Sequence, residues 1–388
     1  MQPRMIHISA PESLGLKRYA ALVLASAVAV LSSSASAQNN LRIGLAAPIS
    51  GPLSNAGRAM AAGFDLGAKD ASARLNRTII PIVENDDGST AGARNAAQAL
   101  LDKGTHVVVG HYTSAATRTG NALYARKNVL LIAPSASSPK LIEPKSANVL
   151  RLGPREDSAG LFAGRYLARE FPSTQIAIVS DGSVTSSIFA SAAKSAWNRQ
   201  QTKPVIEAQL LSTPGDAVAN AAQLVQTLNG KNVAAIYWTG GVSMAGTFLR
   251  ALQATGANTP VIASETLATP EFPAAAGDAT EGLRMTILAI TTQSAQAQSI
   301  AARMKAEGVR DIPLALATYA SVQVVTETAA RLDTLDSARL AAALRGGAPI
   351  ETIVGPVSFD VTGERREQLY TIAIWKKAAD GKFIFTPQ

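Results

Sequence analysis

The segment from Thr105 to Pro139 constrains the fold most strongly. It holds two short apolar, β-branched runs, His106 to Val109 and Asn128 to Ala133, and between them Ser114 to Lys127 has helical spacing. A strand–helix–strand unit of this kind needs a right-handed crossover and gives two parallel strands. The same alternation runs from Leu41 to Ser264, which predicts an α/β fold with doubly wound parallel sheets.

Small hydroxyl residues follow both strands of this segment. Thr113 and Ser114 follow the first strand, and Ser135 to Ser138 follow the second. Ligands of open parallel sheets bind beyond the carboxyl ends of the strands, so we expect both turns to face one crevice. Ser114 also begins the predicted helix, where free N–H groups and the helix dipole favour an anion. The alternative is that Ser114 serves only as an N-cap.

The amino terminus has the three-part layout of a secretory signal peptide. Basic residues precede an apolar run from Tyr19 to Leu31, and Ala35-Ser36-Ala37 forms a cleavage site of the A-x-A type. We therefore predict that residues 1–37 are a cleaved signal peptide and that the mature protein is exported. The apolar run is short for a membrane span of about 20 residues, although an uncleaved anchor is the alternative. The absence of cysteine excludes a lipoprotein anchor and disulfides.

The length and the order of the predicted elements indicate two similar lobes. A chain of 388 residues exceeds the usual size of one core. Leu41 to Leu152 and Pro154 to Met285 each form a series of alternating strands and helices. The last third differs: three helices are predicted over 294–307, 316–331 and 337–344, and strands follow over 350–360 and 368–385, the latter with a hairpin turn at residues 379–382.

Composition and motifs exclude several classes of function. The formal charge of +8 is not gathered into a basic run with aromatic residues, so no nucleic-acid partner is predicted. No nucleotide-binding glycine motif occurs, and no cofactor or metal site is predicted from a chain with three His and no Cys. Asp86-Asp87 fits an Asx turn better than a metal pair. His111 could be a base but fits a hydrogen-bonded structural role better.

Ser243 lies in a sequence similar to the nucleophile elbow of serine hydrolases, Gly241 to Ala245. That fold requires a His after the Ser in chain order, whereas every His of this chain precedes Ser243. Glu265 is a stronger candidate for a functional residue, because it follows a predicted strand in the second half of the chain. A carboxylate there could meet a ligand cation across a cleft, and the alternative is a solvated loop residue.

Taken in order, these segments resemble the type I periplasmic binding proteins, in particular the leucine/isoleucine/valine-binding group that serves ABC importers. The resemblance covers the mature chain and rests on PISGPLSNAG (48–57), VVVGHYTSAAT (107–117), LLIAPSASSPKL (130–141), QIAIVSDGS (175–183), AIYWTGG (235–241), SETL (264–267), EGLR (281–284), ATYASVQ (317–323) and IVGPVSFDVTGE (353–364). No single segment is diagnostic, but their order and spacing together are specific.

The resemblance implies two Rossmann-like lobes with parallel sheets joined by a hinge of three crossovers. The crossovers are expected near Gly153-Pro154, at Thr286 to Ile290 and at Gly355-Pro356. This places lobe 1 at residues 38–153 and 290–355, and lobe 2 at residues 154–289 and 356–388.

The resemblance also assigns ligand-binding roles at matching positions. Ser114 would bind a ligand carboxylate, and Ser137 stands where the family usually has Thr. Ser135 and Ala136 would contribute backbone groups, and Glu265 would pair with an α-ammonium group. Where the family has aromatic walls around the ligand, this chain has Ala56, Thr185, Gly241 and Leu314.

These departures predict a larger and more polar pocket than one for leucine. Thr113 also occupies a position of the cysteine pair found in some members of the family. We expect a bulkier or more polar amino acid, a dipeptide-like compound or an aromatic ligand. The implied function is a monomeric, non-enzymatic solute receptor that docks on an ABC permease. A ligand sensor of the same fold and, more remotely, a serine hydrolase are the alternatives.

Overall fold

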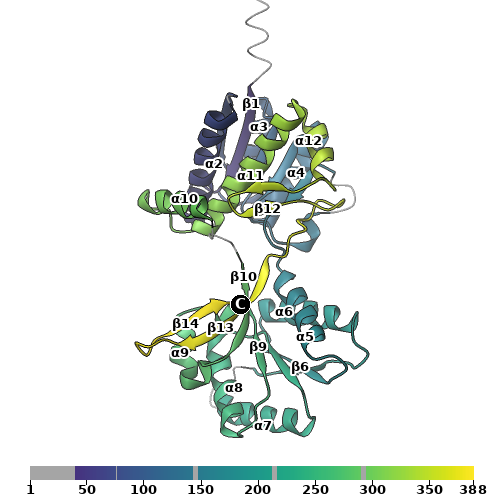
Figure 1. The fold of residues 1–388 in the computed structure, drawn as a ribbon. Helices are drawn as coiled ribbons and strands as arrows, with labels where there is room; N and C mark the ends of the chain where they lie inside the picture. The colour runs from purple at the N-terminus through teal and green to yellow at the C-terminus, as the bar shows by residue number, and fades with distance from the viewer. Residues whose placement is uncertain (1–39, 76, 143–146, 212–215, 290–293) are drawn as a thin grey trace, which may run out of the picture.

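The computed structural model describes residues 40–75, 77–142, 147–211, 216–289 and 294–388. The predicted signal peptide, residues 1–37, lies outside these ranges. The described residues form two lobes, one above the other in Figure 1, each built around its own sheet. The predicted α/β fold with two lobes on parallel sheets is therefore confirmed.

The first lobe is built on a five-stranded parallel sheet in the order β2-β1-β3-β4-β5. Leu45 lies opposite Val83 on one side and Val109 on the other. Helices cover both faces of this sheet, which explains why its inner strands are apolar along their length. The strands are β1 (Leu41–Ala47), β2 (Ile79–Asn85), β3 (Val107–Gly110), β4 (Leu130–Ala133) and β5 (Val149–Arg151).

The helices of the first half pack on opposite faces of this sheet. Phe64 of α2 joins the apolar cluster that contains Val107 and Val109, whereas Leu100 of α3 and Tyr124 of α4 join the cluster of the other face. The elements are α2 (Ser54–Leu75), α3 (Thr90–Asp102), α4 (Ser114–Tyr124) and the 3-10 turns η1 (Ala125–Lys127) and η2 (Pro139–Leu141).

The second lobe is built on a seven-stranded mixed sheet in the order β14-β13-β10-β9-β8-β6-β7. Strands β6 to β10 pair in parallel, and β13 and β14 extend the sheet as antiparallel strands from the end of the chain. The strands are β6 (Ile176–Ser180), β7 (Ile206–Gln209), β8 (Ala235–Trp238), β9 (Val261–Ala263), β10 (Arg284–Leu288), β13 (Tyr370–Lys377) and β14 (Phe383–Pro387). The predicted hairpin turn near residues 379–382 is confirmed.

Helices again cover both faces of this sheet. Trp197 of α6 packs with Tyr237 and Ile178 on one face, and Phe248 of α8 packs with Trp238 on the other. The elements are α5 (Ser158–Glu170), α6 (Val184–Asn198), α7 (Ala217–Gly230), α8 (Val242–Ala254), α9 (Glu271–Ala276), η3 (Glu265–Leu267) and η4 (Gly277–Thr280).

The chain then returns to the first lobe. Its three predicted helices are confirmed as α10 (Ala295–Ala306), α11 (Ile312–Leu332) and α12 (Ser337–Leu344), and a short antiparallel pair follows, β11 (Ile350–Thr352) and β12 (Gly355–Val357). Helix α11 lies directly against α2 (Figure 1), and Gly63 permits this approach. A Cβ at Gly63 would lie 2.0 Å from the Ala315 carbonyl oxygen.

The third crossover lies further along the chain than predicted. The prediction that this crossover lies at Gly355-Pro356 is wrong, because Val357 and Phe359 are fully buried in the core of the first lobe. The chain reaches the second sheet only at Tyr370, where β13 begins. Of the second predicted crossover, Thr286 to Ile290, the first residues belong to β10 and Ile290 lies outside the described residues.

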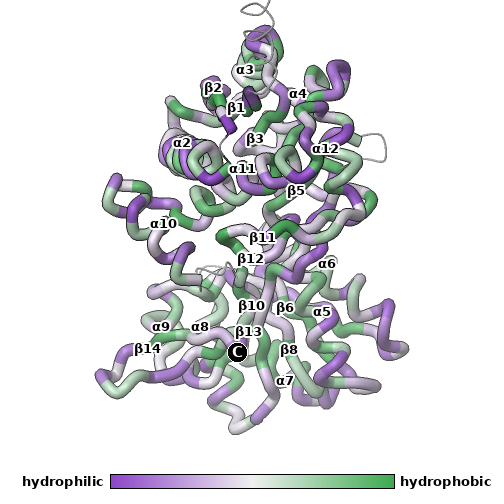
Figure 2. Tube along the Cα trace, turned by 45° about the horizontal axis from the view of Figure 1, so that its top comes forward, coloured by the Kyte–Doolittle hydropathy of each residue, from purple (hydrophilic) through white to green (hydrophobic). Residues whose placement is uncertain are grey.

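Hydrophobic residues gather on strands inside each lobe, for example on β3 (Figure 2). None of the described helices combines the length and the apolar character that a membrane crossing requires.

Candidate functional site

A cavity of about 410 Å³ lies at the carboxyl ends of β3 and β4, where the two lobes meet. Thr113 and Ser114 from the first hydroxyl turn and Ser135 and Ser137 from the second all line it. The structure therefore brings both turns to one cavity, as the sequence predicts. Among the residues that the structure describes, the second lobe contributes apolar or backbone surface to this cavity, from Leu288, Ala289 and Leu369.

In the first turn, Thr113 rather than Ser114 caps helix α4. The Thr113 hydroxyl accepts a hydrogen bond from the Ala116 N–H at 3.2 Å. The alternative reading of Ser114 as only an N-cap is therefore wrong, because Ser114 is the first residue inside the helix. Its hydroxyl accepts a hydrogen bond from the Ser138 N–H at 3.1 Å, which joins the two turns.

The second turn follows β4 and is tied to the first by side chains. The Ser135 hydroxyl donates to the Tyr112 carbonyl at 2.9 Å. Ala136 is buried and does not line the cavity, whereas Ser137 lines it. Within the part of the chain that is described, the N–H groups of Ser135, Ala136 and Ser137 have no hydrogen-bond partner. Free N–H groups on a turn beside the positive end of α4 provide the chemistry of an anion site.

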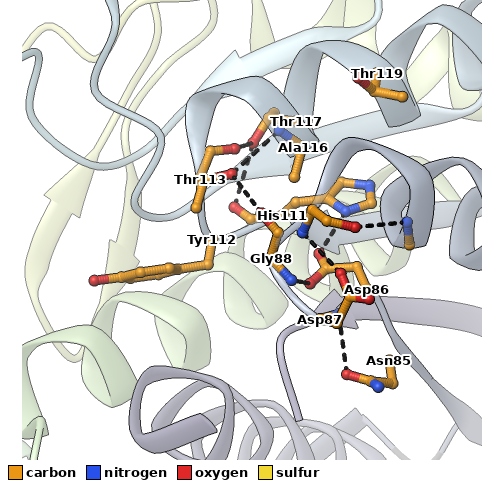
Figure 3. A network of polar contacts seen from close by, with 12 residues as sticks. Asn85, Asp86, Asp87, Gly88, His111, Tyr112, Thr113, Ala116, Thr117 and Thr119 are labelled. Carbon is orange, nitrogen blue, oxygen red and sulfur yellow. Dashed lines mark hydrogen bonds and ion pairs between the residues drawn. The ribbon is translucent and has the colours of Figure 1, made fainter. Parts of the chain in front are cut away.

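A fully buried polar network supports the first turn from below (Figure 3). His111 Nδ1 lies 2.7 Å from Asp86 Oδ2, and its Nε2 lies 3.2 Å from the Tyr124 hydroxyl. Asp86 Oδ1 also accepts from the Gly88 N–H at 2.9 Å, so the Asx turn predicted here is confirmed. His111 has the predicted structural role, since both its ring nitrogens are hydrogen-bonded.

Glu265 lies at the carboxyl end of β9, on the second lobe, and is half-buried. Burial raises the pKa of its carboxyl group to about 7, and a hydrogen bond from the Tyr370 hydroxyl acts in the opposite direction. A desolvated carboxylate of this kind gains strongly from a cationic partner. In the present arrangement of the lobes, Glu265 does not line the cavity that holds the serines.

The four positions that replace family aromatic walls lie in different places. Leu314, near the start of α11, lines the cavity. Ala56 lies in the first turn of α2 and Thr185 is exposed in the first turn of α6, and neither lines the cavity. Gly241 precedes α8, and its N–H donates to Asp181 Oδ2 at 2.7 Å. The cavity therefore unites four of the predicted residues, Ser114, Ser135, Ser137 and Leu314.

Sequence reasoning missed several residues that line the cavity. Tyr112 supplies an aromatic side chain next to the first turn, and it points away from the buried network in Figure 3. Arg365 comes from the segment before β13 and places a guanidinium group, paired with Glu367, at the cavity wall. Tyr112 lies inside the GHYTS segment and could have been found there, whereas Arg365 depends on the late third crossover. The described residues contain no group of His, Asp and Glu side chains suited to a metal ion.

Comparison with known proteins identifies the family. The model of the family described as periplasmic binding protein matches residues 40–382. The chain belongs to the periplasmic binding protein family. The Leu/Ile/Val-binding protein homolog 1 of Brucella abortus (strain 2308) is 26% identical over 363 residues, which cover 93% of this chain and 97% of that protein.

Further relatives and solved structures agree with this family. The Leu/Ile/Val-binding protein BraC3 of Rhizobium johnstonii is 27% identical over 356 residues, which cover 91% of this chain and 96% of that protein. An ABC transporter substrate-binding protein from Sphaerobacter thermophilus is similar in structure, with a TM-score of 0.68 and 17% identity over 90% of this chain and 97% of that one. This likeness shows a shared fold.

Proposed function

We propose that the protein is the solute-binding subunit of an ABC importer and that it binds an amino acid or a related zwitterion between its lobes. The observation that carries the proposal is the pair of hydroxyl turns with free N–H groups on one cavity, opposite a lobe that holds a desolvated carboxylate. The names of the relatives, which are Leu/Ile/Val-binding proteins, support the same class of ligand.

The ligand carboxylate lies on the first lobe in this proposal. The free N–H groups of Ser135 to Ser137 and the first turn of α4 provide donors, and the Ser114 hydroxyl adds another. Donors fixed by a rigid scaffold bind an anion without the cost of ordering them. Because several such donors point their partial positive charges at one place, they favour binding of the anionic end of a ligand here rather than on the apolar surface of the second lobe.

The ligand ammonium group pairs with Glu265 when the lobes close. A ligand that touches both lobes binds the closed form more tightly than the open one and so shifts the population towards closure. The closed form then docks on a membrane permease in the inner membrane. The protein acts as a monomer in the periplasm, exported by the signal peptide of residues 1–37, and catalyses no reaction.

Paired ligand analogues test the two ends of the proposed zwitterion separately. A thermal-shift screen of amino acids first selects the tightest ligand. Calorimetry then compares this amino acid with its methyl ester, which lacks the carboxylate, and with its desamino acid, which lacks the ammonium group. We expect each analogue to bind at least tenfold more weakly. Equal affinity for all three compounds, or no binding of any amino acid, would refute the proposal.

A further inference from the structure

Three carbonyl oxygens of the turn from Ser135 to Ser138 accept hydrogen bonds from Arg151 and Glu156. The Ala136 carbonyl accepts from Arg151 Nη1 at 2.6 Å, and the Ser138 carbonyl accepts from Arg151 Nη2 at 2.7 Å. Between them, the Ser137 carbonyl accepts from the Glu156 N–H at 2.9 Å. Three successive carbonyl groups are therefore held by residues of β5 and of the first crossover.

This polarity of the turn has a direct consequence for its N–H groups. The Ala136 carbonyl and the Ser137 N–H belong to one trans peptide group and point in opposite directions. Arg151 therefore orients the Ser137 N–H through the Ala136 carbonyl, and that N–H has no partner among the described residues. A flipped peptide group would instead present a carbonyl oxygen and repel an anion. The orientation of these peptide groups thus decides whether the turn attracts or repels a carboxylate.

The side chain of Arg151 is held in place by burial and by hydrogen bonds. It is the last residue of β5, its side chain is fully buried, and its backbone N–H donates to the Gly363 carbonyl at 2.9 Å. Its Nε lies 2.8 Å from Glu364 Oε2, and its Nη2 lies 3.3 Å from Glu364 Oε1. Glu364 is itself fixed, since its N–H donates to Asp360 Oδ1 at 3.1 Å. A buried guanidinium needs such a partner to remain charged and in place.

We infer that Arg151, anchored by Glu364, is a positioning residue that orients the Ser135–Ser138 turn for ligand binding. This inference rests on the proposed function, in which that turn binds the ligand carboxylate. Arg151 does not touch the ligand: it holds two carbonyl groups away from the cavity and connects the turn to the segment that leads into the third crossover.

A purely structural role is the competing explanation, and the chain offers a matched control. Arg345 also binds carbonyl groups of the first lobe, those of Ala147 at 3.0 Å, Val149 at 2.8 Å and Val361 at 3.1 Å. None of these carbonyls belongs to the turn. Arg151→Met and Arg345→Met therefore each remove a guanidinium from several carbonyl groups, but only Arg151→Met releases the turn.

The experiment combines amide hydrogen exchange of the ligand-free protein with calorimetry, using L-leucine as the probe. The Ser138 N–H is protected by its bond to Ser114, so its exchange rate reports the orientation of the turn. We expect Arg151→Met to accelerate this exchange about tenfold or more and to weaken L-leucine binding by a similar factor. Arg345→Met should lower the melting temperature and change neither quantity.

Two milder variants distinguish an effect on the orientation of the Ser135–Ser138 turn from a general effect on folding. Arg151→Lys keeps the charge and can still donate to a carbonyl, but it lacks the planar fork that holds both carbonyls and Glu364 at once, so about half of the lost free energy of binding should return. Glu364→Gln keeps a hydrogen bond and removes the anchoring charge, so it should have a smaller effect than Arg151→Met. Should Arg151→Met not fold, these two variants decide the question.

The inference is overturned if the Ser138 exchange rate is unchanged in the Arg151 variants, or if Arg345→Met changes it equally. Wild-type protein that binds no L-leucine agrees with a pocket for a bulkier or more polar amino acid, and the exchange result then decides the role of Arg151. A screen in which no amino acid binds refutes the proposed function instead. The two failures are thus distinguishable.

Discussion

The two lobes contribute to the cavity in different ways. The first lobe supplies the polar lining of the two hydroxyl turns, which are cross-linked by side chains and supported by a buried network. The second lobe supplies Leu288, Ala289 and Leu369, and its candidate ligand group, Glu265, lies outside the cavity. Under the proposed function, this difference predicts that the ligand binds first to a preformed site on the first lobe and then favours closure of the second lobe.

The largest effect is expected from Asp86, which tests whether the first lobe is rigid because of its buried network. Asp86→Ala leaves His111 and the Gly88 N–H without their partner in a fully buried position. We expect a loss of about 3 kcal/mol in the free energy of unfolding, measured by urea denaturation. Asp87→Ala removes the neighbouring exposed carboxylate and should cost much less. Equal losses in the two variants would show that the network does not stabilise the lobe.

Glu265→Ala tests the contribution of the second lobe. It should weaken binding of an α-amino acid by roughly tenfold or more, because the ligand ammonium group loses its partner in a desolvated place. Calorimetry measures the change. Glu271→Ala alters an exposed carboxylate of the same lobe and serves as the control. Unchanged affinity in Glu265→Ala would show that Glu265 does not bind the ligand ammonium group.

The pH dependence of binding sharpens the same comparison. The raised pKa of Glu265, about 7, means that the free protein carries a neutral carboxyl group below that pH. Only the carboxylate attracts an ammonium group, so affinity should be highest above pH 7 and fall about tenfold between pH 8 and pH 6. Glu265→Gln should abolish this dependence. A pH profile that is the same in both proteins would assign the titration to another group.

Ser114→Ala tests a single donor of the first lobe. The variant loses one proposed hydrogen bond to the ligand carboxylate and the bond from the Ser138 N–H, while the free N–H groups of the turn remain, so we expect a loss of about fivefold in affinity. Ser243→Ala, in the exposed first turn of α8, is the matched control. A loss of more than a hundredfold would mean that the hydroxyl group, rather than the peptide groups, dominates the site.

The smallest effect is on the stability of the ligand-free protein. The pKa of Glu265 is raised on folding, so its contribution to stability is complete below about pH 4.5 and is lost as the pH rises through 7. Glu265→Gln should therefore raise the melting temperature at pH 8 by about 2 °C and have no such effect at pH 4. A lower melting temperature at pH 8 would show that the carboxylate stabilises the free protein.

Much of this organisation could be predicted from the sequence because it depends on local patterns. Alternating apolar runs and helical spacing predicted both sheets, and the hydroxyl residues after β3 and β4 predicted where polar groups meet. Parallel strands leave little freedom in this respect, since their carboxyl ends share one edge.

The remaining features depend on contacts between distant parts of the chain. The sequence predicts the third crossover too early because Gly355-Pro356 has the composition of a turn, whereas packing on the first lobe decides the burial of Val357 and Phe359. The sequence places Arg151 only at the end of a strand. Its hydrogen bonds to the second turn depend on Glu364, which lies 213 positions further along the chain and anchors its guanidinium group. Local spacing carries no signal of such a pair.

The most direct test of the account is a crystal structure of the protein saturated with the amino acid that the thermal-shift screen selects. We expect closed lobes, with the ligand carboxylate on the Ser114 and Ser137 turns and its ammonium group within hydrogen-bond distance of Glu265. A bound ligand that contacts the serines while Glu265 still faces a separate solvent space would contradict it.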